Sequence, residues 1–253
     1  MDLSWLSRTE LLIGKESLEK LSRSHVMVIG LGGVGSFAAE FVARSGVGRM
    51  TIVDGDVVDP TNRNRQLVAL ATNHGESKAT IMAERIRQIN PEIELEVVNE
   101  FIQPEMVEAL LSKQPDYLIE AIDSITPKLT VISTALKSKL AFVSSMGAGG
   151  RVDPTKLRIA DIADTYGCPF AQQVRKQLKN TFGVKSGFKA VFSTESADRE
   201  SVIHTDGSKF KKSAYGTISY LPAVFGATTA SVAIREIIGM PVLAFQSGPA
   251  KTN

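Results

Sequence analysis

The sequence has a single cysteine, Cys168, among its 253 residues. A disulfide within the chain is therefore excluded, and so is a zinc site built from cysteine pairs. Histidines are also few: His25, His74 and His204 show no metal-ligand spacing, and we expect them to be structural or surface residues. Neither residue type predicts a metal centre.

A large excess of charge of one sign is absent as well. Lysine and arginine number 29 and aspartate and glutamate 27, which gives a net charge of +2. A nucleic-acid partner cannot be inferred from this balance, so any basic surface has to be local. The N-terminal stretch MDLSWLSRTELL lacks the basic and apolar regions of a signal peptide. Together with the lone cysteine, this predicts a cytoplasmic protein.

A membrane-spanning run is the third absence. The most apolar stretch, residues 217–234, contains Pro222, Gly226 and several hydroxyl side chains. Its hydrophobicity per residue is modest for a membrane helix. We therefore expect a helix buried at the back of the fold or in a dimer interface, and no membrane partner.

What remains is a regular alternation of apolar strands and amphipathic helices. Hydrophobic residues make up 43% of the chain and charged residues 22%, as in ordinary globular proteins. Alternation at this spacing predicts a parallel sheet with right-handed crossovers. The expected strands cover residues 25–30, 49–56, 94–102, 116–123 and 140–150, and the expected helices cover residues 34–45, 77–89, 104–112 and 126–139.

The predicted fold class is α/β: a doubly wound, Rossmann-like, mostly parallel sheet with helices on both faces. A charged helical lead-in occupies residues 1–24, and residues 25–150 form the core. After Gly150 the pattern weakens. We expect residues 151–253 to extend the same domain, with a strand within 185–196 and a mobile loop around 204–216.

A glycine-rich turn follows the first expected strand, in the stretch VMVIGLGGVG. Gly30, Gly32 and Gly35 satisfy the pattern G-x-G-x-x-G. A turn without Cβ atoms lets backbone N–H groups approach a phosphate at the N-terminus of a helix. The motif predicts a nucleotide but does not distinguish NAD, FAD and ATP.

Polar residues at the ends of the expected strands separate these nucleotides. Asp54 lies nineteen residues after Gly35, where an NAD site has its ribose-binding carboxylate. A triphosphate with charge developing at its α-phosphorus also needs cations and a magnesium-binding carboxylate. Arg65, Lys78 and Asp123 supply that set, and an NAD site would give the three no joint role. The sequence therefore favours ATP.

Four motifs carry a family resemblance: GLGGVG, DGDVVDPTNRNRQ, GESKA and EAIDS. They resemble the adenylation domain of ubiquitin-activating enzymes and of the ThiF and MoeB adenylyltransferases of thiamine and molybdopterin synthesis. The stretches INPEIELEVVNEFI, SSMGAGGRVDPTKLRIADIADT and VFSTES further resemble the bacterial tRNA threonylcarbamoyladenosine dehydratases. Relatives that hand on sulfur typically carry two C-x-x-C pairs, which this chain lacks. Cys168 stands where we expect an aspartate in this family, and we interpret it as a neutral substitution.

The resemblance implies an ATP-binding adenylation core over residues 25–150 and a substrate and dimer region over 151–253. Glycines would line the phosphates, an aspartate would bond the ribose, and Asp123 would ligate Mg²⁺. Arg8 would enter the ATP site of a neighbouring subunit. The implied catalytic residues are Arg8, Arg65, Lys78 and Asp123, and the implied nucleotide-binding residues are Gly30, Gly32, Gly33, Gly35, Asp54, Asp56, Asn62, Arg65, Gln66 and Lys78.

The implied reaction starts when a carboxylate attacks the α-phosphate of ATP, which yields an acyl-adenylate and pyrophosphate. In tRNA carrying threonylcarbamoyladenosine, the carbamoyl group then closes a ring and expels AMP, so the net change is loss of water. No protein nucleophile is required, in agreement with a single cysteine. The resemblance also implies a homodimer, a sulfur-relay or cysteine desulfurase partner and, as some relatives suggest, a monovalent cation at the dimer interface.

For tRNA, the candidate surface is a basic set in the C-terminal region, with Arg151 near the site. The basic set is Arg151, Arg175, Lys176, Lys179, Lys185, Lys189, Lys209, Lys211 and Lys212.

Three other functions stay open: activation of a ubiquitin-like sulfur carrier, NAD-dependent oxidoreduction, and a non-catalytic nucleotide-sensing scaffold.

Overall fold

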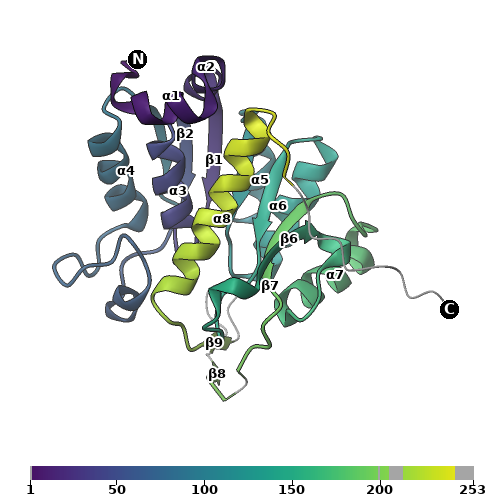
Figure 1. Cartoon of the computed structure of the whole chain (residues 1–253). Helices are drawn as coiled ribbons and strands as arrows, with labels where there is room; N and C mark the ends of the chain where they lie inside the picture. Colours follow the sequence, from purple (N-terminus) through teal and green to yellow (C-terminus); the bar gives the residue numbers. More distant parts are fainter. Residues whose placement is uncertain (1, 199, 205–212, 243–253) are drawn as a thin grey trace.

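The computed structural model describes residues 2–198, 200–204 and 213–242. Its main sheet contains β1 (His25–Ile29), β2 (Arg49–Val53), β3 (Glu94–Val98), β4 (Tyr117–Glu120), β5 (Phe142–Ser145), β6 (Leu157–Asp161) and β7 (Lys189–Ser193). These strands are ordered β3-β2-β1-β4-β5-β7-β6 (Figure 1). Neighbours are parallel except β6, which runs antiparallel to β7.

Helices cover both faces of this sheet. They are α1 (Ser7–Ile13), α2 (Lys15–Arg23), α3 (Gly35–Arg44), α4 (Lys78–Ile89), α5 (Pro104–Leu111), α6 (Ile125–Lys137), α7 (Pro169–Phe182) and α8 (Tyr220–Ile237). Side chains of α2, α3, α4 and α8 contribute to one core, and side chains of α5, α6 and α7 to the other. The predicted doubly wound α/β fold is confirmed.

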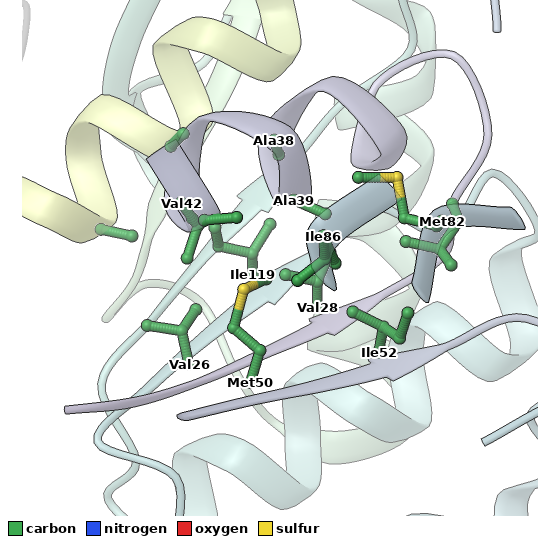
Figure 2. Close-up of a cluster of buried hydrophobic side chains, with 14 of the residues drawn as sticks. Val26, Val28, Ala38, Ala39, Val42, Met50, Ile52, Met82, Ile86 and Ile119 are labelled. Atoms are coloured by element: carbon green, nitrogen blue, oxygen red, sulfur yellow. The ribbon is translucent and has the colours of Figure 1, made fainter. Parts of the chain in front are cut away.

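The central strand β1 is apolar from Val26 to Ile29 because both of its faces are covered. Val26 and Val28 enter the core beneath α3 and α4, where Figure 2 shows them among alanine, valine, isoleucine and methionine side chains. Met27 and Ile29 alternate into the core on the opposite face. Because successive side chains of a strand point to opposite faces, a strand covered on both sides has to be apolar at every position.

The strand order reverses at β1, which lies between β2 and β4. Connections from these strands leave on opposite sides of the sheet, so a crevice opens beyond their carboxyl ends. The glycine-rich turn after β1, the loop after β2 and the loop after β4 all meet at this edge. The topology therefore brings the predicted polar residues to one place.

All five expected strands are shorter than predicted, and the first two end at Ile29 and Val53. The fourth ends at Glu120 rather than at residue 123, so Asp123 lies in the loop before α6. The reason is local: the N–H of Ala121 still donates to the Ile29 carbonyl at 2.9 Å, whereas the N–H of Ile122 donates to a side-chain oxygen of Glu120 at 2.8 Å. A side chain thus takes the place of the neighbouring strand. The third strand stops at Val98 and the fifth at Ser145.

The C-terminal region contains more regular structure than its weak pattern predicts. Both β6 and α7 were not anticipated, whereas the strand expected within 185–196 is present as β7. The apolar stretch near the end forms α8, which packs against α3, β4 and β5 as a buried helix. Within the described ranges, no helix is long and apolar enough to cross a membrane.

A two-stranded antiparallel pair, β8 (Val202–His204) and β9 (Ser213–Tyr215), stands where a loop was expected. The centre of that expected mobile loop, residues 205–212, lies outside the described residues. The N-terminal lead-in is two helices, because Gly14 adopts φ +84° and interrupts the helical path between α1 and α2. That φ favours glycine, which has no Cβ to clash.

Candidate functional site

The glycine-rich turn is packed tightly at two of its glycines. A Cβ on Gly35 would come within 1.7 Å of the Gly30 carbonyl oxygen, and Gly30 itself adopts φ +90° against the backbone of Ala121. A Cβ on Gly33 would lie 3.0 Å from Pro222. By contrast, a Cβ on Gly32 would meet only the Gln66 amide, at 3.9 Å. The backbone around Gly32 is therefore the part of the turn that has space beside it.

Asp54 fastens the end of β2 to this turn. One carboxylate oxygen accepts the N–H of Leu31 at 2.6 Å, and the other accepts the N–H of Asp56 at 2.7 Å. Burial raises the pKa of Asp54, and these two N–H groups and the charge of Lys78 oppose that rise. A carboxylate oxygen can accept a further hydrogen bond. Asp54 is therefore held in position with capacity left for a hydroxyl donor.

Lys78 is a buried cation at the first position of α4. Its ammonium lies 3.0 Å from the carboxylate of Asp56, and its side chain is 5% exposed. The helix begins here because Ser77 caps it, accepting the N–H of Thr80. Backbone and side chain thus fix the lysine beside the loop after β2. A positive charge at this depth is suited to a polyanionic ligand that enters the crevice.

Arg65 is placed by the short 3-10 helix η2 (Pro60–Asn64). Its guanidinium donates to the Thr61 carbonyl at 3.0 Å and to the Asn64 side chain at 2.8 Å. Burial lowers the pKa of Arg65, and the charge of Asp123 is the larger of two carboxylate effects that oppose the change. Arg65 and Asp123, 58 residues apart in sequence, therefore face the same part of the crevice.

Two amides in the same loop behave differently. Asn62 is buried and accepts the N–H of Asp59 at 3.2 Å, which completes a capping box on η2. In the structure Asn62 stabilises the loop, and its expected contact with a triphosphate stays a prediction. Gln66 is buried beside Gly32, and its side-chain oxygen has no hydrogen-bond partner in the described part of the chain. Such an acceptor is costly unless a ligand or water satisfies it.

Sequence reasoning missed a buried ion pair beneath this edge. The ammonium of Lys128 lies 2.5 Å from Glu120, and it also donates to the carbonyls of Ile122 and Ser145 at 3.0 and 2.9 Å. The hydroxyl of Ser144 donates to the same carboxylate at 2.5 Å. These bonds tie the ends of β4 and β5 to α6 and enclose the loop that carries Asp123. A lysine within the apolar pattern of α6 was the available signal.

Arg8 is not brought to the site of its own chain. It is an exposed residue of α1, and this part of the chain packs where α3 ends, with Leu6 against Gly46. That is the opposite edge of the sheet from the glycine-rich turn (Figure 1). A role for Arg8 in an ATP site consequently requires a second copy.

The predicted basic surface is partly wrong. Arg151 is 4% exposed and donates to the backbone carbonyls of Gly147 and Glu195, so it is no surface contact. Arg175 donates to the Thr165 carbonyl, and Lys189 pairs with Glu236. These three residues have internal partners because each packs against a neighbouring loop or helix. Lys176, Lys179 and Lys185 are exposed, and Lys209, Lys211 and Lys212 lie outside the described residues.

Cys168 is 3% exposed and belongs to the core beneath α6 and α7. This burial agrees with its interpretation as a neutral substitution. Among the residues the structure describes, no group of three or more histidine, cysteine, aspartate or glutamate side chains is arranged to hold a metal ion.

Comparison with known proteins agrees with this geometry. The model of the ThiF family matches residues 6–252. The tRNA threonylcarbamoyladenosine dehydratase of Bacillus subtilis (strain 168) is 42% identical over 243 residues, which covers 93% of this chain and 95% of the relative. The protein of the same name from Escherichia coli (strain K12) is 44% identical over 201 residues, or 76% of this chain and 75% of the relative.

A solved structure supports the same relationship. The crystal structure of E. coli tRNA N6-threonylcarbamoyladenosine dehydratase, TcdA, in complex with ATP superposes with a TM-score of 0.86 at 38% identity. The match covers 94% of this chain and 95% of that one. The resemblance seen in the motifs is confirmed: the chain belongs to the ThiF family.

Proposed function

We propose that this chain catalyses the ATP-dependent loss of water from threonylcarbamoyladenosine in tRNA, through an acyl-adenylate. The observation that carries the proposal is the meeting of four charged residues at one sheet edge, beside the open backbone of Gly32. Asp54 bonds to the glycine-rich turn, Lys78 opens α4 beside Asp56, and Arg65 ends η2 within reach of the charge of Asp123. The substrate is inferred from relatives that are 42% and 44% identical and whose names state this activity.

The residues present fit a nucleoside triphosphate. Asp54 has hydrogen-bonding capacity for ribose hydroxyls, and the side-chain amide of Gln66 lies beside Gly32, with its nitrogen nearest the turn. The two cations, Lys78 and Arg65, suit a triphosphate, whereas a dinucleotide would leave them without a joint role. The E. coli relative was solved in complex with ATP. These points support ATP over NAD.

The residues also fit Mg²⁺ bound through its substrate. Mg²⁺ is usually held by one or two carboxylates together with phosphate oxygens and water. Asp123 provides one carboxylate, close enough to Arg65 to affect its pKa. When bound, the ion would neutralise charge on the departing pyrophosphate.

The chain's own cations stabilise the negative charge of the phosphate oxygens during adenylation. The threonyl carboxylate forms a bond to the α-phosphorus as the bond to pyrophosphate breaks, with Lys78 and Arg65 stabilising the phosphate oxygens. An atom of the carbamoyl group next attacks the activated carbonyl carbon, loses its proton, and expels AMP. One carboxylate oxygen leaves with AMP, so the balance is the loss of one water from the nucleoside.

The proposal includes a homodimer with Arg8 acting across subunits. Two neighbouring side chains of the same helix, Leu11 and Leu12, are 88% and 85% exposed. Exposed apolar side chains of this size mark an interaction surface. The monovalent cation at the interface, the sulfur-relay partner and the cytoplasmic location stay predictions.

The test is turnover of threonylcarbamoyladenosine-containing tRNA whose threonyl carboxylate carries ¹⁸O, with Mg²⁺ and ATP. We expect the nucleoside to lose one water and the label to appear in AMP. Lys78→Ala and Asp123→Ala should abolish the mass change, whereas Lys137→Ala, at the exposed last turn of α6, should not. Unchanged nucleoside despite ATP binding would overturn the dehydratase proposal. Exchange of pyrophosphate into ATP that is stimulated by a carrier protein would instead favour the adenylyltransferase alternative.

A further inference from the structure

Two exposed tyrosines lie at the border of the proposed ATP site. Tyr215 ends β9 and is 41% exposed, and Tyr220 begins α8 and is 45% exposed. Val152 and Ile218 are exposed beside them in the structure, at 58% and 40%. We call these four residues the tyrosine platform. In Figure 1, β9 and the start of α8 lie near one another at the carboxyl edge of the sheet.

The contacts that hold the platform are specific. The hydroxyl of Tyr220 donates to the Val152 carbonyl at 2.8 Å. Tyr215 lies directly on the loop after β5: a Cβ added to Gly149 would come within 2.6 Å of its Cβ, and one added to Gly150 within 3.2 Å of its ring. The two rings are therefore supported from below while a large part of each stays open.

The platform is continuous with the nucleotide site. Pro222, two residues after Tyr220, lies against Gly33 of the glycine-rich turn. On the other side, the carbonyl of Thr217 accepts the side-chain amide of Asn64 at 2.9 Å, and Asn64 in turn accepts a hydrogen bond from Arg65. A ligand whose reacting group reaches the phosphates would thus extend onto the tyrosines.

A buried donor beneath the platform lacks a partner. Arg151 anchors the loop that supports Tyr215, through bonds from its guanidinium to the Gly147 and Gly149 carbonyls at 2.7 and 3.2 Å. Its remaining terminal nitrogen, Nη2, has no hydrogen-bond partner among the described residues, although the side chain is 4% exposed overall. An unpaired buried donor is costly unless a water or another acceptor satisfies it.

We propose that the tyrosine platform stacks an unpaired RNA base next to the modified nucleoside, an inference that rests on the proposed function. In the proposed complex the nucleoside is turned out of the base stack, which brings its threonyl carboxylate to the α-phosphate in the crevice. Its neighbours in a single-stranded loop then lose stacking partners. Aromatic side chains replace such partners in proteins that recognise RNA loops, because every base has a π-face.

The test measures binding and turnover separately. The probe is a stem-loop RNA that carries threonylcarbamoyladenosine in its single-stranded loop, and the proteins are full-length Tyr215→Ala, Tyr220→Ala and the two corresponding phenylalanine variants. Stacking on one aromatic side chain corresponds to about a tenfold change or more in affinity. We expect each alanine variant to raise the KM for the RNA about tenfold, with kcat and the Kd for ATP within twofold to threefold of wild type. Phenylalanine should restore most of the loss because it keeps the ring.

Three further measurements separate the outcomes. Phe182→Ala, at the exposed end of α7, is the matched control and should leave the KM for the RNA unchanged. The Kd of the same RNA for the Lys78→Ala protein, with and without the tyrosine changes, measures the contribution of the platform to binding in the absence of turnover. If that Kd does not depend on the tyrosines, or if the alanine variants instead change the oligomeric state, the platform proposal is overturned. A tyrosine-dependent Kd in a protein that never cyclises the nucleoside would overturn the proposed reaction and keep the platform.

Discussion

The ammonium of Lys128 lies 2.5 Å from the carboxylate of Glu120, and neither side chain is exposed to solvent. Removing one member of a fully buried pair leaves an uncompensated charge, which typically costs about 3–5 kcal/mol. Lys128→Met should therefore lower the free energy of unfolding by about that amount in urea titrations. The double variant Glu120→Gln, Lys128→Met should be clearly more stable than the single one. A single variant as stable as wild type would contradict the argument.

His25 should make stability depend on pH. Burial, followed by the charge of Arg49, lowers the pKa of His25 from its ordinary value of 6.5, and its ring nitrogen lies 2.8 Å from the Thr51 hydroxyl. Because the unfolded chain binds the proton more readily, stability is present above about pH 6.5 and is lost as the pH falls through that value. Urea midpoints between pH 7.5 and 5 should decline in wild type. In His25→Gln the decline should be smaller, and an identical slope would refute this assignment.

Two glycines of one turn should tolerate alanine very differently. Gly35→Ala places a Cβ 1.7 Å from a carbonyl oxygen, and no rotamer relieves a backbone clash. We expect this protein to unfold or to lose several kcal/mol, as backbone strain and overpacking do. Gly32→Ala meets nothing closer than 3.9 Å, so its melting temperature should stay near that of wild type. Calorimetry of the two variants, with ATP titration of Gly32→Ala, distinguishes folding from binding.

Asp56 should compete with phosphate for Lys78. The pair is preformed at 3.0 Å, so a bound triphosphate has to share or replace it. Asp56→Asn leaves the buried ammonium without its charged partner and should destabilise the unliganded protein by about 1–3 kcal/mol. Because ATP would then supply the missing charge, its stabilising effect on the melting temperature should grow. A thermal shift with ATP smaller than that of wild type would show that Asp56 helps binding rather than opposing it.

The sheet and the position of the site were predictable because they depend on short-range patterns. The strand residues from Val26 to Ile29 are all apolar, and the turn after them shows the glycine pattern at Gly30 and Gly35. Strand ends were less predictable, since Glu120 caps the N–H of Ile122 with a side chain. No local sequence pattern predicts that a side chain replaces the neighbouring strand as the hydrogen-bond acceptor.

Buried charged side chains were the part of the structure that the sequence predicted least well. In the sequence Arg151 and Lys128 resemble ordinary surface cations. The structure buries both: Arg151 donates to the Glu195 carbonyl, and Lys128 donates to the Ser145 carbonyl. The helix α7 did carry a signal, because Ala171, Val174 and Leu178 face the core at helical spacing. The short strand β6 carried little, since most of its residues are only half-buried at the edge of the sheet.

The contact between α8 and the glycine-rich turn constrains the order of events during synthesis. A Cβ on Gly226 would lie 2.5 Å from the carbonyl oxygen of Val34, so the two segments meet backbone to backbone. Almost two hundred residues separate them. The turn therefore leaves the ribosome long before the helix that completes its packing has been made. Until then the face of α3 that packs against α8 stays uncovered, so the emerging chain carries exposed apolar surface that favours aggregation.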